Sequence, residues 1–231
     1  MLGTTVLSGD LPKALADALT IRPSWAAWHG PHKTDGATLA ALSSLSDEAC
    51  MSRYQRGDTA AFRVLYLRYR DKLHRYVLRL AGNHGEAEEV FQEAWVSVIR
   101  GRDVYQSERS FAAWLFALAH RRAADRWRAL SRHAPDWQHR ADSGEDDSLD
   151  PPVPAVSHTP EAAIQNDALR DALLVAVEAL PLPQREAFLL RAEAELGLED
   201  IATITGVSRE TVKSRLRYAQ RRLREALGAW R

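Results

Sequence analysis

The sequence predicts an all-α protein with two small helical domains joined by a flexible acidic, proline-rich linker. Apolar residues recur at intervals of three and four in several long segments, which is the period of an amphipathic helix. No segment shows the alternation of strands and helices that a parallel sheet requires. Residues 131–160 instead carry five prolines among acidic and small polar residues, a composition typical of a linker.

The first helical domain is expected at residues 46–130. Helical periodicity marks a short segment at 47–54 and three longer segments at 59–80, 86–100 and 111–128. The apolar stripe in the first long segment is nearly continuous, which indicates core packing. Residues 1–45 mix glycine, proline and threonine with only a short helical pattern. We therefore expect residues 1–45 to form a poorly ordered extension.

The second helical domain is expected at residues 165–231, after a linker at 131–164. An apolar helical pattern at 169–180 is broken by two prolines and resumes at 184–194. Acidic residues concentrate at the linker between Asp142 and Asp150. The formal net charge of zero therefore hides a segregation of acidic and basic segments along the chain.

A helix-turn-helix outline lies near the end of the sequence. A short candidate helix at 199–204 is followed by Gly206, which can take the positive φ of a tight turn, and by Ser208, whose hydroxyl can cap a helix. The next helix begins at about Arg209, with an apolar stripe at Val212, Leu216, Ala219, Leu223 and Leu227. Seven basic residues and one acid lie between Arg209 and Arg224. A solvated surface helix is the alternative, but such helices usually mix signs, so we interpret the segment as a nucleic-acid-binding helix.

Composition and motifs argue against several other classes of protein. The single cysteine, Cys50, excludes an internal disulfide and any CxxC metal or redox motif. The chain has no HExxH, no GxSxG and no phosphate-binding loop, and its eight histidines are scattered. The apolar run 111–119 is too short to span a bilayer, and the N-terminus lacks a basic signal-peptide region. We expect a soluble cytoplasmic protein that is not an enzyme and has neither a cofactor nor a metal site.

Four ordered motifs across the two domains resemble the extracytoplasmic-function (ECF) sigma factors, which are small two-domain members of the bacterial sigma-70 family. The first domain contains "RGDTAAF" (56–62), "EAEEVFQEAWVSVIR" (86–100) and "FAAWLFALAHRRAADRWR" (111–128). The second contains "LPLPQREAFLLR" (180–191) and "LEDIATITGVSRETVKSRLRYAQRRLRE" (198–225). The resemblance covers about 46–130 and 165–227 and implies a transcription initiation factor that directs RNA polymerase core to promoters.

The resemblance assigns a role to each domain. The first domain would dock on polymerase core through an acidic helix face and would open and read the −10 promoter element. The residues expected to bind the core are Glu88, Glu89, Gln92, Glu93 and Val96. Those expected at the −10 element are Arg102, Tyr105, Arg109, His120, Arg121, Arg122, Arg126, Trp127 and Arg128. The helix-turn-helix would read the −35 element through Ser208, Arg209, Glu210, Thr211, Lys213, Ser214, Arg215, Arg217 and Arg221.

One position departs from the family pattern. Arg121 in "ALAHRRAAD" stands where relatives commonly carry asparagine, whose amide is associated with reading the −10 element. Arginine replaces a short neutral donor and acceptor by a long cation that cannot accept a hydrogen bond. We expect Arg121 to contact a phosphate or an unpaired base, with an ion pair to Asp125 as the alternative.

Other functions are compatible with a helical chain that carries this motif. A helix-turn-helix regulator that does not act as a sigma factor is the main alternative, and a response regulator is disfavoured because residues 46–130 show no receiver pattern of strands. A sigma-like protein that binds polymerase without initiating transcription is a third. The resemblance also makes an anti-sigma factor a candidate partner, beside core polymerase and promoter DNA.

Overall fold

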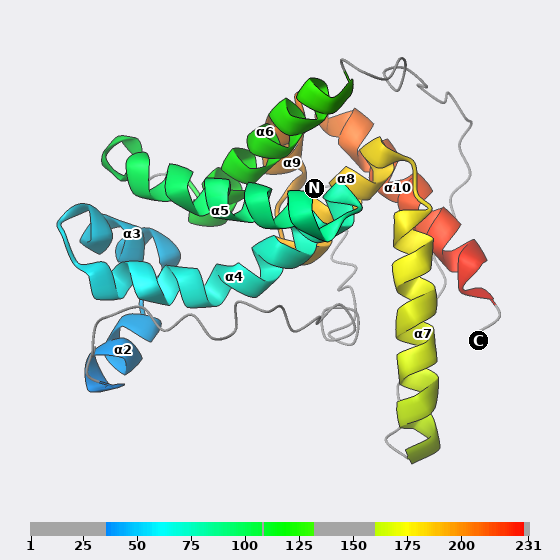
Figure 1. Cartoon of the computed structure of the whole chain (residues 1–231), viewed down its shortest axis with the longest axis horizontal. Helices are drawn as coiled ribbons and strands as arrows, with labels where there is room; N and C mark the ends of the chain where they lie inside the picture. The colour runs from blue at the N-terminus through cyan, green and yellow to red at the C-terminus, as the bar shows by residue number, and fades with distance from the viewer. Residues whose placement is uncertain (1–35, 108, 132–159, 229–231) are drawn as a thin grey trace, which may run out of the picture.

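The computed structural model describes residues 36–107, 109–131 and 160–228. A first body comprises α2 (Gly36–Ser43), α3 (Asp47–Gln55), α4 (Thr59–Ala81), α5 (His84–Arg100), the 3-10 turn η2 (Arg102–Val104) and α6 (Phe111–Ser131). A second body comprises α7 (Pro160–Glu178), α8 (Leu182–Glu193), α9 (Leu198–Thr205) and α10 (Arg209–Ala226). All the regular elements in these ranges are helical, which confirms the predicted fold class (Figure 1).

The helices pack within each body, and the buried apolar residues of the two bodies form one continuous cluster. In the first body α4, α5 and α6 lie against one another, while α2 and α3 pack on α4. In the second body α10 packs on α7, α8 and α9. Figure 1 shows α8 and α9 beside the first body, and the contacts join α8 to α4 and α9 to α6. The second body therefore rests on α4 and on α6, the helix expected to meet the −10 element, and we call this arrangement closed.

Local hydrogen bonds explain where the long helices begin and end. The Asp58 carboxylate accepts from the backbone N–H groups of Ala60 and Ala61 and so caps α4. The helix stops at Gly82, whose φ of 75° is costly for residues with a side chain. Asn83 then caps α5 by accepting from the N–H of Glu86. The turn between α4 and α5 is thereby fixed by two adjacent residues.

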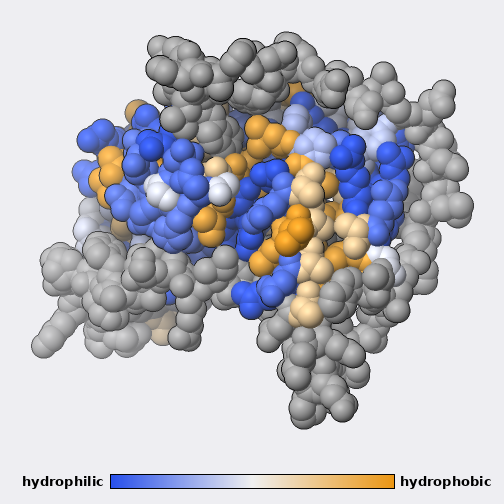
Figure 2. Space-filling view, turned by 45° about the vertical axis from the view of Figure 1, so that its right-hand side comes forward, coloured by the Kyte–Doolittle hydropathy of each residue, from blue (hydrophilic) through white to orange (hydrophobic). Residues whose placement is uncertain are grey.

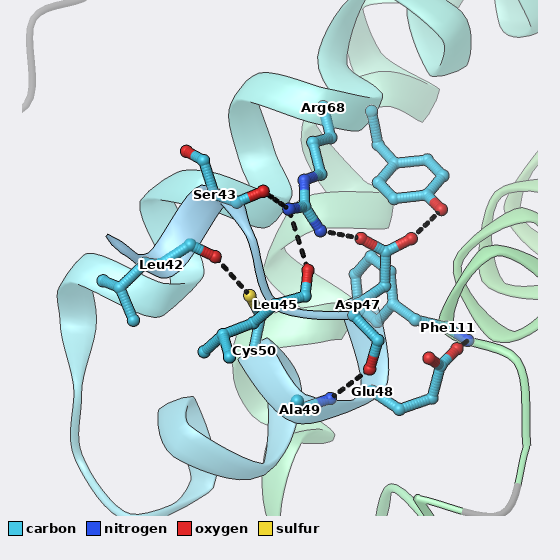
Figure 3. Close-up of polar contacts among 11 residues, drawn as sticks. Leu42, Ser43, Leu45, Asp47, Glu48, Ala49, Cys50, Arg68 and Phe111 are labelled. Carbon is cyan, nitrogen blue, oxygen red and sulfur yellow. Dashed lines mark hydrogen bonds and ion pairs between the residues drawn. The ribbon is translucent and has the colours of Figure 1, made fainter. Parts of the chain in front are cut away.

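A polar cluster ties α2 and α3 to α4, as Figure 3 shows. The Asp47 carboxylate accepts from the Arg68 guanidinium and from the Tyr69 hydroxyl. Arg68 also donates to the backbone oxygens of Ser43 and Leu45, at 2.6 and 2.9 Å. Burial, followed by the hydrogen bond to Asp47, raises the pKa of Tyr69, so its hydroxyl remains a donor. Arg68 thus closes the turn between α2 and α3.

The packed body begins earlier than the expected domain boundary at residue 46. The side chain of Leu42 in α2 is 2% exposed, and its backbone oxygen accepts from the buried Cys50 thiol at 3.5 Å. This part of the expected extension is helical and packs on α4, while residues 1–35 lie outside the described structure. The sequence pattern missed α2 because eight residues give little more than two helical turns to judge.

Two truncations test this boundary. Removing residues 1–35 should leave the unfolding free energy close to that of the full chain. Removing residues 1–45 should lower it by about 2–4 kcal/mol, because Leu42 is no longer buried and Arg68 loses two acceptors. Denaturant unfolding measures the difference, and Leu42→Ala in the full chain should reproduce much of it. Equal stability of the two truncations would show that α2 contributes no packing energy.

The expected linker is shorter at both ends than the sequence pattern predicted. Helix α6 continues to Ser131, and α7 starts at Pro160, inside the predicted linker. Proline lacks the N–H that would be unpaired in a first turn and has a helical φ, so it favours a helix start as well as a linker. The remaining predicted boundaries agree with the observed helices to within about three residues.

Candidate nucleic-acid and polymerase interfaces

The recognition helix, α10, is positioned by a turn and a cap that the sequence predicts. Gly206 ends α9 with a φ of 68°, and the Ser208 hydroxyl accepts from the N–H of Thr211 at 3.1 Å. The buried residues of α10 are Val212, Leu216, Ala219 and Leu223. Because this stripe faces α8 and α9, the polar side chains are directed outward. Ser208 therefore caps α10 as expected, and its contact with the −35 element stays a prediction.

The outward face of α10 carries the cations expected at the −35 element. Lys213, Arg217 and Arg221 are exposed, while Ser214 and Arg215 are half-buried. Their ion pairs lie at the surface, such as that between Arg209 and Glu199 at 2.8 Å. Exposed pairs of this kind contribute little free energy, so a phosphate can replace the carboxylate at low cost. Arg217 and Arg221 also stack over the Tyr218 ring, at 5.4 and 5.0 Å from its centroid.

The loop before α6 corrects one member of the expected −10 set. Tyr105 is 5% exposed, packs on Trp114 with ring centroids 4.9 Å apart, and donates its hydroxyl to the backbone oxygen of Arg109. Its ring is a core side chain that holds the loop, and it offers no free face to a base. Gln55, which the sequence pattern missed, donates from its amide to the backbone oxygens of Arg102 and Tyr105, at 2.8 and 2.9 Å.

The expected −10 cations on α6 differ in how they are held. Arg121 is exposed to solvent. The Arg122 guanidinium donates to the Ser97 hydroxyl at 3.2 Å, and Arg126 pairs with Glu89 of α5. His120 is not exposed with the others, because its Nδ1 lies 2.8 Å from a carboxylate oxygen of Glu186 in α8. The side chains of Trp127 and Arg128 lie outside the described part of the structure.

The outer face of α5 carries the residues expected to bind polymerase core. Glu89, Gln92, Glu93 and Val96 are exposed, over a buried stripe that includes Val90 and Phe91. Glu88 is only partly exposed, accepts from the Gln92 amide at 2.9 Å and lies 4.0 Å from the buried His74. Ile99, which the sequence prediction omitted, is 47% exposed one turn beyond Val96. Its position three residues after Val96 and seven after Gln92, on the same face of the helix, was the signal that could have identified it.

Exposed apolar side chains also occur outside the expected sites. Val104 in η2 and Val175 in α7 are among the most exposed large apolar residues. Figure 2 shows apolar residues gathered along the described half of α7, with hydrophilic residues on either side. In the described part of the chain, no helix is both long and apolar enough to cross a membrane.

Comparisons with known proteins agree with the two-body arrangement. The family model for Sigma-70 region 2 matches residues 65–133, and that for Sigma-70, region 4 matches residues 170–223. The RNA polymerase sigma-H factor of Pseudomonas aeruginosa is 30% identical over 186 residues, covering 80% of this chain and 96% of that protein. The ECF RNA polymerase sigma-E factor of Escherichia coli is 31% identical over 172 residues, covering 74% and 89%.

Two solved structures share the fold. One is the sigma factor RpoE bound to the anti-sigma factor NepR from Bartonella quintana, with a TM-score of 0.54, 24% identity and coverage of 74% of this chain and 98% of that one. The other is CnrH bound to the cytosolic domain of CnrY, with a TM-score of 0.52, 20% identity and coverage of 79% and 97%. With the sequence relatives, these findings place the chain in the ECF class of the sigma-70 family of RNA polymerase sigma factors, the transcription initiation factors that direct polymerase to promoters.

Proposed function

We propose that the first body docks on RNA polymerase core through α5 and reads the −10 element with α6 and the preceding loop, while α10 reads the −35 element. The observation that carries this proposal is the division of charge between the two faces. The outer face of α5 combines Glu89 and Glu93 with the apolar Val96, whereas α10 presents Lys213 and Arg217. An acidic face repels DNA and suits a basic protein partner, and a basic face suits phosphates.

The proposed −35 contacts follow from the direction of α10. A recognition helix enters the major groove by its N-terminal turns, so Glu210, Lys213 and Ser214 would face base edges. Arginine and lysine pair with guanine, and glutamate accepts from cytosine. Arg215, Arg217 and Arg221 would follow the phosphates, in keeping with their spacing along the helix.

The proposed −10 contacts combine Arg102 and Arg109 of the loop with Arg121, Arg122 and Arg126 of α6. Arg102 and Arg109 flank Tyr105, whose buried side chain holds the loop in place. The loop can therefore present their planar guanidinium groups from a rigid backbone. Stacking of an unpaired base on such a group contributes about 1–3 kcal/mol. This geometry supports a role in holding separated DNA strands. The protein would act in the cytoplasm, where the polymerase works. An anti-sigma factor is a further candidate partner.

Copurification with polymerase core, followed by run-off transcription, tests the function. We expect the chain to bind core and to confer initiation at specific promoters. Core binding without initiation would instead identify a sigma-like protein of another kind. Failure to bind core, with DNA binding retained, would favour an independent helix-turn-helix regulator.

The replacement Arg121→Asn tests the −10 assignment. The variant should sharpen or shift sequence preference at the −10 element, because a neutral amide discriminates bases better than a long cation. It should also flatten the salt dependence of initiation, since one cation is lost. Promoter libraries randomised separately at the two elements, transcribed at two salt concentrations, measure both effects.

The −35 library is the internal control for Arg121→Asn, because α10 is unchanged and its preference should stay the same. If variant and parent select the same −10 sequences with the same salt response, Arg121 does not contact DNA. The i,i+4 pair with Asp125 would then be the better account of this arginine.

A further inference from the structure

The ion pairs across the contact between the two bodies are segregated by charge. In the ion pairs that the described residues form across it, α4 and α6 contribute the basic side chains and the second body contributes glutamates. The pairs are Lys72 with Glu195 at 2.8 Å, Arg75 with Glu193 at 2.9 Å, Arg79 with Glu178 at 2.9 Å and His120 with Glu186 at 2.8 Å. Lys72, Arg75 and Arg79 follow one another on one face of α4 at i, i+3 and i+7.

The centre of this contact is withdrawn from water without complete pairing. The side chains of Arg75 and Glu193 are 11% and 2% exposed. One oxygen of Glu193, together with Nε and Nη2 of Arg79, is buried without a hydrogen-bond partner in the described structure. Burial raises the pKa of the Glu193 carboxyl even though Arg75 lies beside it. A buried and incompletely paired ionic contact costs free energy to maintain, which favours its replacement by groups that pair more completely.

The backbone conformation of Glu195, at the edge of the contact, also costs free energy in the closed arrangement. Glu195 has a φ of 57°, and it is the non-glycine residue with positive φ in the described chain. Side chains are disfavoured in this conformation, where glycine would be relaxed. The Glu195 carboxylate is placed on Lys72 of the other body by this strained residue.

The contact between the two bodies holds His120 of α6, while Arg121 of α6 and the cations of α10 stay exposed. His120 lies on α6 beside Arg121 and is held by Glu186, and α9 also packs on α6. The two promoter elements are named for positions about 25 base pairs apart, or ~85 Å of duplex at about 3.4 Å per pair. A compact chain of this length has a radius of gyration of only about 17 Å, so the closed form cannot engage both elements.

We propose that the basic face formed by Lys72, Arg75, Arg79 and His120 is a binding surface for DNA phosphates, and that the glutamates of the second body occupy it in the free protein. The carboxylates stand where phosphate oxygens would bind, so DNA and the second body compete for one surface. The face is thereby masked in the free protein, and separation of the two bodies exposes it. The proposal rests on the proposed function for its biological meaning, but its test uses free protein and DNA.

The test neutralises the glutamates and keeps every cation of the face. Glu186→Gln, Glu193→Gln and Glu195→Gln are combined in a chain that also carries Lys213→Glu and Arg217→Glu, so that α10 contributes little to binding. The probe is a duplex that lacks both promoter elements. Compared with the chain without the glutamine changes, we expect at least roughly tenfold tighter binding and a log–log salt slope steeper by about two, since Lys72 and Arg75 are freed and each cation adds roughly 0.9. Unchanged affinity and slope would overturn the proposal.

A reversible chemical cross-link between the two bodies provides the second test. Lys72→Cys and Glu195→Cys place thiols at an accessible ion pair, while the native Cys50 is fully buried. A short bismaleimide with a reducible disulfide should join them in the free protein. The locked protein should lose run-off transcription at least tenfold relative to the same double-cysteine protein without cross-linker, and it should recover this activity on reduction. Failure of the thiols to join, or full activity when locked, would contradict self-masking.

The two experiments distinguish failure of the masking proposal from failure of the proposed sigma-factor function. If the parent does not initiate transcription with polymerase core, the proposed function fails, and the duplex titration still decides whether the basic face binds phosphates. Circular dichroism of the glutamine variant shows whether its helices are intact. Should that variant lose helicity, Glu195→Gly alone relieves backbone strain and removes one carboxylate, and it should still raise the salt slope by about one.

Discussion

Replacing Lys213 and Arg217 together by glutamate is expected to abolish initiation from specific promoters, by about a hundredfold or more, while association with polymerase core is unchanged. Both cations are exposed on α10, away from the buried stripe that includes Leu216 and Leu223. Each contact to a base or phosphate contributes about 1–3 kcal/mol, and about 1.4 kcal/mol is a factor of ten. Run-off transcription and a pull-down with core measure the two properties separately.

The matched control is Arg222→Glu, which reverses a charge on the same helix beyond the turns that would enter the groove. Its effect on initiation should be several-fold at most. The single change Arg217→Ala should lower the salt slope of promoter binding by about one unit, as expected for one phosphate contact. If that variant keeps the parent's slope, Arg217 does not contact a phosphate.

Changing Gln92 and Glu93 together to lysine is expected to weaken association with polymerase core at least tenfold without unfolding the protein. Both side chains are exposed on α5 and face away from the buried Val90 and Phe91. A like charge placed against a basic partner costs several kcal/mol. A pull-down with core, at equal helicity by circular dichroism, decides this prediction.

The control for docking is Asp171→Lys, which reverses an exposed acid on α7. This change alters net charge in the same direction but lies in the other body, so binding to core should be nearly unaffected. Equal losses in the two variants would mean that overall charge, and not the α5 face, governs association. Loss of helicity with Gln92 and Glu93 changed would make those side chains structural.

The sequence predicted the helices, turns and caps that depend on residues close to one another along the chain. The stripe of α10, the turn at Gly206 and the cap at Ser208 all involve residues within a few positions of one another, and the observed helix begins at Arg209 as expected. Three- and four-residue spacing also separated the exposed face of α5 from its core. These features depend on interactions between residues close in sequence, so they can be predicted without knowledge of the fold.

The features that the sequence could not supply depend on contacts between distant segments. Tyr105 is in a loop that looks open, but Trp114 and Phe111 bury its ring. Gln55 reaches that loop from nearly fifty positions away, at separations of 47 and 50 residues. His120 looked like one more basic residue beside the arginines, and only its partner Glu186 in the other body sets it apart.

The positive φ of Glu195 has a consequence for laboratory evolution of this protein. Glycine at this position would relieve strain of about 1 kcal/mol, the usual cost of a left-handed backbone for other residues. A library selected only for resistance to heat should therefore accumulate the change Glu195→Gly and lose the bond to Lys72. A library selected for low background transcription should keep the glutamate. The two selections would thus diverge at a single codon, and sequencing the survivors would show which property this residue serves.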